Sequence, residues 1–176
     1  MIENEKDFRP ASIIEIAKQM CLAARTAPKA CGKDNLEIAI VAGDDLLILS
    51  AEMKKIGEQK QNPTFLRDAE NIKSAQCIVI IGTKRQTIGL RYCGFCGFEN
   101  CATAEKNGGL CAFNAGDLGI AIGSAVSVAA DHRLDNRLMY TIGMAAVAMG
   151  LLGHEVKIAF GIPLSVSGKN PFFDRK

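Results

Sequence analysis

Apolar residues follow two different rhythms along the first half of the chain. Over residues 10–27 they recur every three or four residues, which predicts an amphipathic helix, and in two other stretches they run almost continuously, which predicts strands. The run at 76–82 (QCIVIIG) is almost uniformly apolar and β-branched, so we expect a central strand covered on both faces. The predicted helices are residues 10–27, 44–58 and 62–74, and the predicted strands are residues 36–42 and 76–82.

Prolines and one capping residue set the ends of these helices. Pro28 ends the first helix, because proline disfavours helical geometry in the residue before it. Asp44 stands where the side chain of an N-cap is expected, and Pro63 stands at a first helical position.

Small residues dominate the second half, which predicts helices at 117–130 and 138–152 and a last strand at 156–160. Gly161-Ile162-Pro163 is expected to end that strand. A glycine inside a helix costs about 1 kcal/mol relative to alanine. The helical glycines at 119, 123, 143 and 150 therefore indicate places where another backbone or a flat ligand approaches closely. Strands and helices alternate throughout, so we expect one domain, residues 1–176, of the α/β (α+β layered) class.

Composition narrows the class of protein. The chain is 48% apolar and 23% charged, with a net charge of +2, so it has no signature of a nucleic-acid or anionic-membrane binder. Its longest apolar stretches are interrupted well before the ~18 residues that a membrane span needs. The start, MIENEKDFRP, lacks the basic and apolar regions of a secretory signal. We therefore expect a cytoplasmic protein.

Four of the seven cysteines lie close together, with the spacing C-x2-C-x4-C-x9-C: Cys93, Cys96, Cys101 and Cys111. Four thiolates are the usual ligand set of a [4Fe-4S] or [2Fe-2S] cluster, and also of structural zinc. Zinc sites more often pair two C-x2-C knuckles, and bare thiols in a loop would be open to oxidation. The pattern favours an iron–sulfur cluster in segment 90–111, with the other two interpretations still open.

The remaining candidate residues have plainer interpretations. Cys21 and Cys77 fall in apolar runs, which predicts buried small side chains, and Cys31 falls in a loop. His132, in a dense run of charges, is either a proton donor in a site or part of a solvated connection, and we favour the second. The tail SVSGKNPFFDRK is apolar enough to fold over its own core or over a neighbouring subunit.

Residues from Leu90 onward resemble the uncharacterised ferredoxin-domain proteins of anaerobic bacteria and archaea. The matching stretches are CGFCGFENCATAEKNGGLCAFNAGDLGIAIGSAVSVAADHRLDNRLMYTIG and IPLSVSGKNPFFDR. CGFCGFENC is also similar to the opening of small 4Fe-4S domains in electron-transfer subunits and corrinoid iron–sulfur proteins. The resemblance implies a [4Fe-4S] cluster on Cys93, Cys96, Cys101 and Cys111.

A second resemblance is to FMN-dependent nitroreductases, in AARTAPKACGKDNLEIAIV, AIGSAVSVAA and GIPLS. It implies a nitroreductase-like sheet flanked by helices, a homodimer and bound FMN. Carried over by position, Arg25, Thr26, Pro28 and Asn35 would lie near the flavin, and Arg25 and Asn35 are the expected contacts. The Arg-Ser-x-Arg opening of many nitroreductases is missing, and the corresponding region offers only Arg9 and Arg25.

The leading hypothesis is therefore an iron–sulfur redox protein with one [4Fe-4S] cluster, which with FMN bound would act as a reductase of a small acceptor. Its partners would be a redox protein or a small-molecule acceptor, together with a second copy of the chain. Two alternatives remain: a non-catalytic, ferredoxin-like electron carrier, and a zinc-stapled structural domain.

Overall fold

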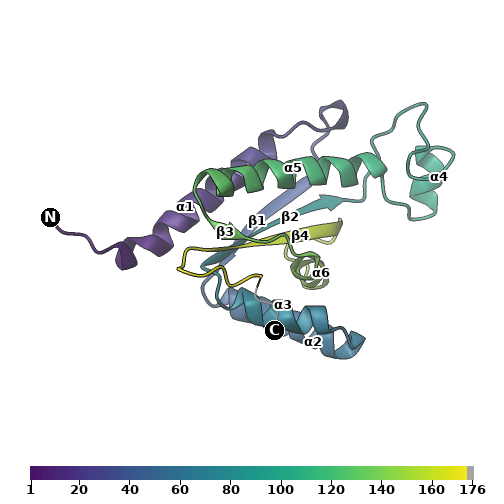
Figure 1. Cartoon of the computed structure of the whole chain (residues 1–176). Helices are drawn as coiled ribbons and strands as arrows, with labels where there is room; N and C mark the ends of the chain where they lie inside the picture. The colour runs from purple at the N-terminus through teal and green to yellow at the C-terminus, as the bar shows by residue number, and fades with distance from the viewer. Residues whose placement is uncertain (174–176) are drawn as a thin grey trace.

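The computed structural model describes residues 1–173 and has a four-stranded antiparallel sheet between two layers of helices (Figure 1). Helices α1 and α5 pack on one face of the sheet, and helices α2, α3 and α6 pack on the other. This mixed α/β architecture confirms the predicted fold class. In the sheet order β1-β2-β4-β3, the strands are β1 (Leu36–Ala42), β2 (Cys77–Lys84), β4 (Val156–Ser165) and β3 (Asp135–Asn136).

Strand β2 is the central strand that its composition predicts. Its first seven residues are all buried, and it pairs with β1 on one side and β4 on the other. Cys77, Val79 and Ile81 belong to the core under α1 and α5, whereas Ile78 and Ile80 belong to the opposite core. Successive side chains of a strand point to opposite faces, so the uniform apolar run serves both cores.

Strand β4 is longer than predicted and runs through Gly161-Ile162-Pro163 instead of ending there. Gly161 exchanges both backbone hydrogen bonds with Met139 on the β3 side of the strand. The backbone N–H and C=O groups of successive strand residues point to alternate sides. The nitrogen of Pro163, two residues after Gly161, therefore also faces the β3 side. It falls between the Met139 bridge and the Asp135–Ser165 pair, where the sheet requires no donor.

Two helices begin earlier than predicted. Helix α1 begins at Glu5, because the side chain of Asn4 accepts the Lys6 N–H at 3.1 Å and caps the helix; Pro10 lies inside it. Helix α5 begins at Ala112, five residues before Asp117. The helix bounds are α1 (Glu5–Thr26), α2 (Asp45–Lys60), α3 (Pro63–Ile72), α4 (Cys101–Lys106), α5 (Ala112–Asp131) and α6 (Tyr140–Ala148), with a short 3-10 turn at Ala30–Gly32.

Helix α5 packs along α1 through small buried residues. Ala17 and Ala24 of α1 share a core with Ala121 and Ala125 of α5, and side chains this small let the two backbones approach closely. Among the described residues, α5 is the one helix long and apolar enough to cross a membrane by length and composition. Glycine, serine and aspartate still interrupt its apolar residues, as expected from the sequence, and its inner face packs against α1.

The predicted close approach at a helical glycine occurs at Gly143 of α6. A Cβ atom built there would overlap the carbonyl group of Ala159 in β4, and one built on Gly161 would overlap Ile142. Helix α6 thus lies directly on the backbone of β4. Gly119 and Gly123 of α5 differ, because no atom described in the structure lies within 4 Å of a Cβ at either position.

The C-terminal tail folds over the core of its own chain, as far as it is described. Phe172 is fully buried among residues of α2, α3, α6 and the sheet. Arg137 donates a hydrogen bond of 2.7 Å to the Phe172 carbonyl, and its guanidinium lies 5.1 Å from the ring centre of Phe173. The last residues of the predicted tail, 174–176, lie outside the described part.

Candidate functional site

One end of the sheet brings the predicted site residues into the same region. Strands β1 and β4 begin there and β2 ends there, since Thr83 pairs with Leu36 on one side and Ile158 on the other. Segment 90–111 follows β2 and leads directly into α5, and with α4 it projects beyond this end of the sheet (Figure 1). The cysteine segment and the predicted flavin contacts, which come from separate parts of the sequence, therefore belong to the same end of the sheet.

Polar contacts tie the cysteine segment to this end of the sheet. Thr87 donates a hydrogen bond of 2.5 Å to Glu105 of α4, and the Arg85 side chain lies over the backbone of Gly108. From the turn between α1 and β1, Lys33 donates to the Ile88 carbonyl at 2.7 Å. The segment is thus held at its base while most of its residues between 91 and 110 stay exposed or half-buried.

The four predicted ligands occupy different positions on this segment. Cys93 is exposed, and Cys96 and Cys101 are half-buried. Cys101 begins α4, a helix absent from the predicted elements and capped by Asn100, which accepts the Thr103 N–H at 2.9 Å. Cys111 is buried at the N-cap position of α5. Within residues 1–173, no three His, Cys, Asp or Glu side chains gather into a group that could hold a metal ion.

The donor set and the backbone nevertheless fit an iron–sulfur cluster. All four thiols lie in one segment, and Gly94 and Gly97, which follow the first two cysteines, have φ values of 104° and 83°. Only glycine adopts such angles readily, so the chain turns sharply beside each thiol. The ring of Phe95 stacks on Phe113, with centroids 5.5 Å apart, and Phe98 packs on Gly109. These rings place apolar surface beside the thiols.

A buried amide pair joins the predicted flavin residue Asn35 to the start of α5. The Asn35 amide donates to the side-chain oxygen of Asn114 at 3.1 Å, and the Asn114 amide donates to the carbonyls of Lys84 and Gln86. Asp117, also buried, accepts the Ala30 N–H at 2.9 Å. Sequence analysis missed both α5 residues. Their signal was two polar residues, three apart, just before an apolar and glycine run at residues 118–123.

Arg25, the other predicted flavin contact, forms an ion pair at the same end of the sheet. It lies 2.7 Å from Asp34 and donates to the Leu36 carbonyl at 3.0 Å. Burial opposes ionisation of Asp34, but the hydrogen bonds from Arg25 and from the Leu36 amide, with the charge of Arg25, hold the pKa of Asp34 below its usual value. Burial lowers the pKa of Lys29, whose ammonium group caps α1 at the Ala24 carbonyl.

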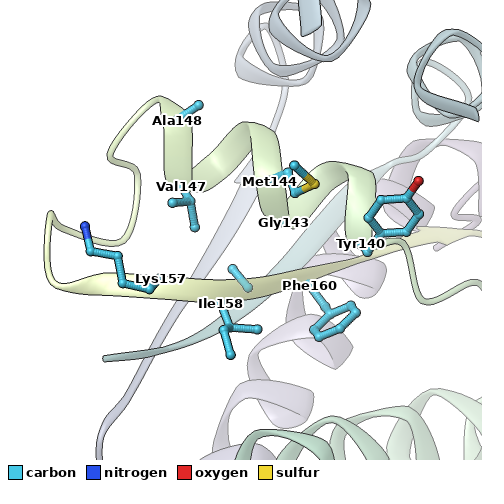
Figure 2. A pocket seen from close by; sticks show the side chains of 9 residues that line it. Tyr140, Gly143, Met144, Val147, Ala148, Lys157, Ile158 and Phe160 are labelled. Carbon is cyan, nitrogen blue, oxygen red and sulfur yellow. The ribbon is translucent and has the colours of Figure 1, made fainter. Parts of the chain in front are cut away.

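An apolar groove, which sequence analysis did not find, runs between α6 and the first half of β4. Its volume is about 340 Å³. Figure 2 shows Tyr140 at one end of the groove and Lys157 at the other, with Met144 and Val147 of α6 facing the β4 side chains. The Lys157 ammonium donates to the His154 carbonyl at 2.8 Å. A groove of this size and lining suits a small, flat, largely apolar molecule. Its lining residues are Tyr140, Gly143, Met144, Val147, Ala148, Lys157, Ile158, Ala159 and Phe160.

Of the three cysteines outside the segment, Cys77 and Cys31 have the predicted surroundings, whereas Cys21 is half-buried and not buried as predicted. Cys77 is fully buried, and burial, together with the nearby thiol of Cys21, raises its pKa to about 12. Such a thiol stays protonated and unreactive. Cys31 is exposed in the turn after α1. His132 is exposed at the end of α5, as expected of a solvated connection.

Several solved structures have a similar fold, and two of them are described as nitroreductases that bind or depend on FMN. A nitroreductase with bound FMN from Desulfitobacterium hafniense DCB-2 aligns with a TM-score of 0.59 at 16% identity, over 88% of this chain and 78% of that protein. An FMN-dependent nitroreductase from Clostridium difficile R20291 aligns with a TM-score of 0.56 at 16% identity, over 88% and 76%. At these identities the likeness establishes the nitroreductase-like fold, as predicted.

Sequence relatives give the family. The family described as "Uncharacterized protein containing a ferredoxin domain (DUF2148)" matches residues 107–175, a stretch that includes Cys111 and begins after the other three predicted ligands. An uncharacterized protein of Archaeoglobus fulgidus is 41% identical over 184 residues, which cover 99% of this chain and 98% of the relative. The chain belongs to this family of uncharacterised proteins containing a ferredoxin domain.

Proposed function

We propose that this protein is an iron–sulfur redox protein whose segment 90–111 holds one [4Fe-4S] cluster on Cys93, Cys96, Cys101 and Cys111. The observation that carries the proposal is the confinement of four thiols to one segment, anchored at its base and turned by glycines beside the first two. The family description, which includes a ferredoxin domain, supports it. When bound, such a cluster supplies one-electron transfer.

The chain's own residues have a definite part in this function. Phe95 and Phe98 provide apolar surface in the segment that carries the thiols, and the polarity around a cluster is one of the levers that set its potential. Cys111 is fixed by the first turn of α5, and the Asn35–Asn114 pair fixes that turn against β1 and β2. The sheet and α5 thus hold the segment in a constant position relative to the rest of the molecule.

The finer proposal is that FMN binds at the same end of the sheet, which would make the protein a flavin-dependent reductase of a small acceptor. The fold shared with FMN-containing nitroreductases supports it, as do the positions of Arg25 and Asn35 beside the base of the cysteine segment. Arg25 would have to exchange its bond to Asp34 for a flavin oxygen. The alternatives are a carrier with a cluster and no flavin, and a zinc-stapled domain.

We further propose a homodimer in which α5 contributes to the contact. Gly116, Gly119 and Gly123 lie open on its outer face, and Ile120 between them is 49% exposed. Small residues in a row allow two helices to approach closely. Light scattering of the purified chain would give the mass of a dimer, and a monomer that keeps its cofactors would contradict this proposal.

The test is an absorption spectrum of protein purified without oxygen, with iron, sulfide, zinc and flavin assayed on the same sample. A broad band near ~400 nm supports the cluster, and additional flavin peaks support the reductase over the carrier. FMN binding to the purified protein can then be titrated by flavin fluorescence. We expect Arg25→Ala to weaken this binding. A colourless protein holding one zinc would overturn the redox proposal.

A further inference from the structure

The cysteine segment displays aromatic side chains to solvent. Tyr92 is 85% exposed and Phe95 is 78% exposed, and within residues 1–173 only Met1 and Ile2 expose more among large apolar side chains. Both aromatics lie within two residues of Cys93, and Leu110 on the same segment is 41% exposed. Large exposed apolar groups gathered on one segment mark an interaction site, because a free surface rarely leaves them unpaired.

The aromatics are held in position by their neighbours. The Arg91 guanidinium lies 5.5 Å from the centre of the Tyr92 ring, and Phe95 stacks on Phe113. Rings that are already held in place lose less conformational freedom when a partner covers them. Arginine, tyrosine and phenylalanine are also the residues enriched where protein interfaces bind most strongly.

The stretch that carries the aromatics has a small excess of basic side chains. Residues 84–111 contain four basic side chains, Lys84, Arg85, Arg91 and Lys106, against two acidic ones, Glu99 and Glu105. Lys84 is paired with Glu37, which leaves the exposed cations Arg85, Arg91 and Lys106 against the exposed carboxylates of Glu99 and Glu105. A bound cluster with four thiolates adds negative charge at the centre, so the positive charge is confined to the rim. Rim charges steer a partner during its approach.

We infer that the exposed side chains of Arg91, Tyr92, Phe95 and Leu110, all on the cysteine segment, dock a small acidic electron-carrier protein. This inference rests on the proposed function, since it gives the electrons of the segment a route in or out through a protein partner. Tyr92 and Phe95 provide the apolar centre of the contact. Arg91 and Lys106 pair with carboxylates at its rim.

The experiment measures binding of a purified, small acidic ferredoxin to the protein as isolated, by calorimetry at low and at high salt. We expect Tyr92→Ala and Phe95→Ala each to weaken binding about tenfold. Arg91→Glu should weaken it at low salt and reduce its salt dependence. Two exposed residues outside the segment supply matched controls. Leu22→Ala is the control for the aromatics and Lys60→Glu is the control for the arginine. Both variants should bind the ferredoxin as tightly as the unaltered chain does.

Iron and sulfide are assayed in each sample, so that the two proposals fail separately. Iron-containing protein that does not bind the ferredoxin, or that binds it equally well with Tyr92, Phe95 and Arg91 replaced, overturns the docking inference and leaves the cluster intact. Absence of iron overturns the proposed function, whatever the binding result. Binding to vesicles of anionic lipid that Tyr92→Ala and Phe95→Ala abolish, without binding to the ferredoxin, would assign these side chains to a membrane surface and contradict the inference.

Discussion

Asn35 and Asn114 lie 79 positions apart in the chain, and their buried side chains form a hydrogen bond of 3.1 Å at the base of the cysteine segment. Through this pair, the first residue before β1 contacts the first turn of α5. Asn114 also donates to the Lys84 and Gln86 carbonyls, where β2 gives way to the segment. The Asn114 side chain thus joins β1, β2 and α5 where the chain leaves β2 for the cysteine segment and where it returns from that segment into α5.

We expect Asn114→Ala to lower the free energy of unfolding by about 2–3 kcal/mol, because the Asn35 amide and the Gln86 carbonyl lose this partner and the Lys84 carbonyl keeps only the Thr83 hydroxyl. Urea unfolding measures this. Ser127→Ala is the matched control, since Ser127 is exposed on the same helix and bonds only the nearby Ser124 carbonyl. A loss in Asn114→Ala no larger than in the control would show that the pair does not hold the site together.

Replacing Gly143 tests the close contact between α6 and β4. A Cβ at this position would overlap the Ala159 carbonyl, so Gly143→Ala should cost about 3 kcal/mol or more. Gly168→Ala should instead change stability by less than about 1 kcal/mol, because a Cβ there meets open space and its backbone is not left-handed. Thermal unfolding of both variants gives the comparison. Similar behaviour of the two would contradict the observed packing.

The two adjacent phenylalanines of the tail should behave differently. Phe172 is fully buried, so Phe172→Ala should destabilise the protein by about 4 kcal/mol. Phe173 is 55% exposed, and its ring lies against the Arg137 guanidinium. Phe173→Ala should therefore cost less than about 1 kcal/mol. Chemical denaturation distinguishes them. Equal, small losses would mean that the tail does not belong to the core of its own chain.

Cys77 should make the protein less stable in alkali. Its pKa is raised from 9.0 to about 12 in the folded chain, so its contribution to stability is complete below pH 9 and is lost as the pH rises toward 12. Between pH 8 and pH 10, the unaltered chain should lose about 1.4 kcal/mol more than Cys77→Ala does. Urea unfolding at the two pH values measures the difference.

Cys31→Ala, which removes an exposed thiol, is the control and should keep the pH dependence of the unaltered chain. If Cys77→Ala and the unaltered chain lost the same stability between these pH values, the folded state would not be protecting the Cys77 thiol from ionisation.

Local patterns predicted much of the fold. The run at 76–82 is a central strand because its side chains must fill two cores, and that requirement is visible in its composition. The strand at residues 36–42 has the predicted bounds for a similar reason. The end of β4 was predicted wrongly, because Pro163 is compatible with a strand only when its nitrogen faces an unpaired stretch, and that depends on where β3 stops. No local pattern contains this information.

The candidate site, like the fold, was predicted from the sequence only in part. The cysteine spacing identified the candidate ligands, since thiolates that share a cluster must lie near one another in a loop. The Asn35–Asn114 pair and the groove beside α6 were missed, because each depends on segments that meet only in the folded chain. Asn114 and Asp117 were visible as polar residues just before an apolar and glycine run, and their spacing of three could have indicated a shared face.

The most direct test of the central claim is the iron and acid-labile sulfide content per chain of protein purified without oxygen, measured in the unaltered chain, Cys96→Ser and Cys31→Ser. The unaltered chain and Cys31→Ser should hold roughly four irons and four sulfides, because Cys31 lies outside the ligand set. Cys96→Ser should lose most of both. Equal iron and sulfide in Cys96→Ser, or zinc in place of iron in the unaltered chain, would contradict a [4Fe-4S] cluster in segment 90–111.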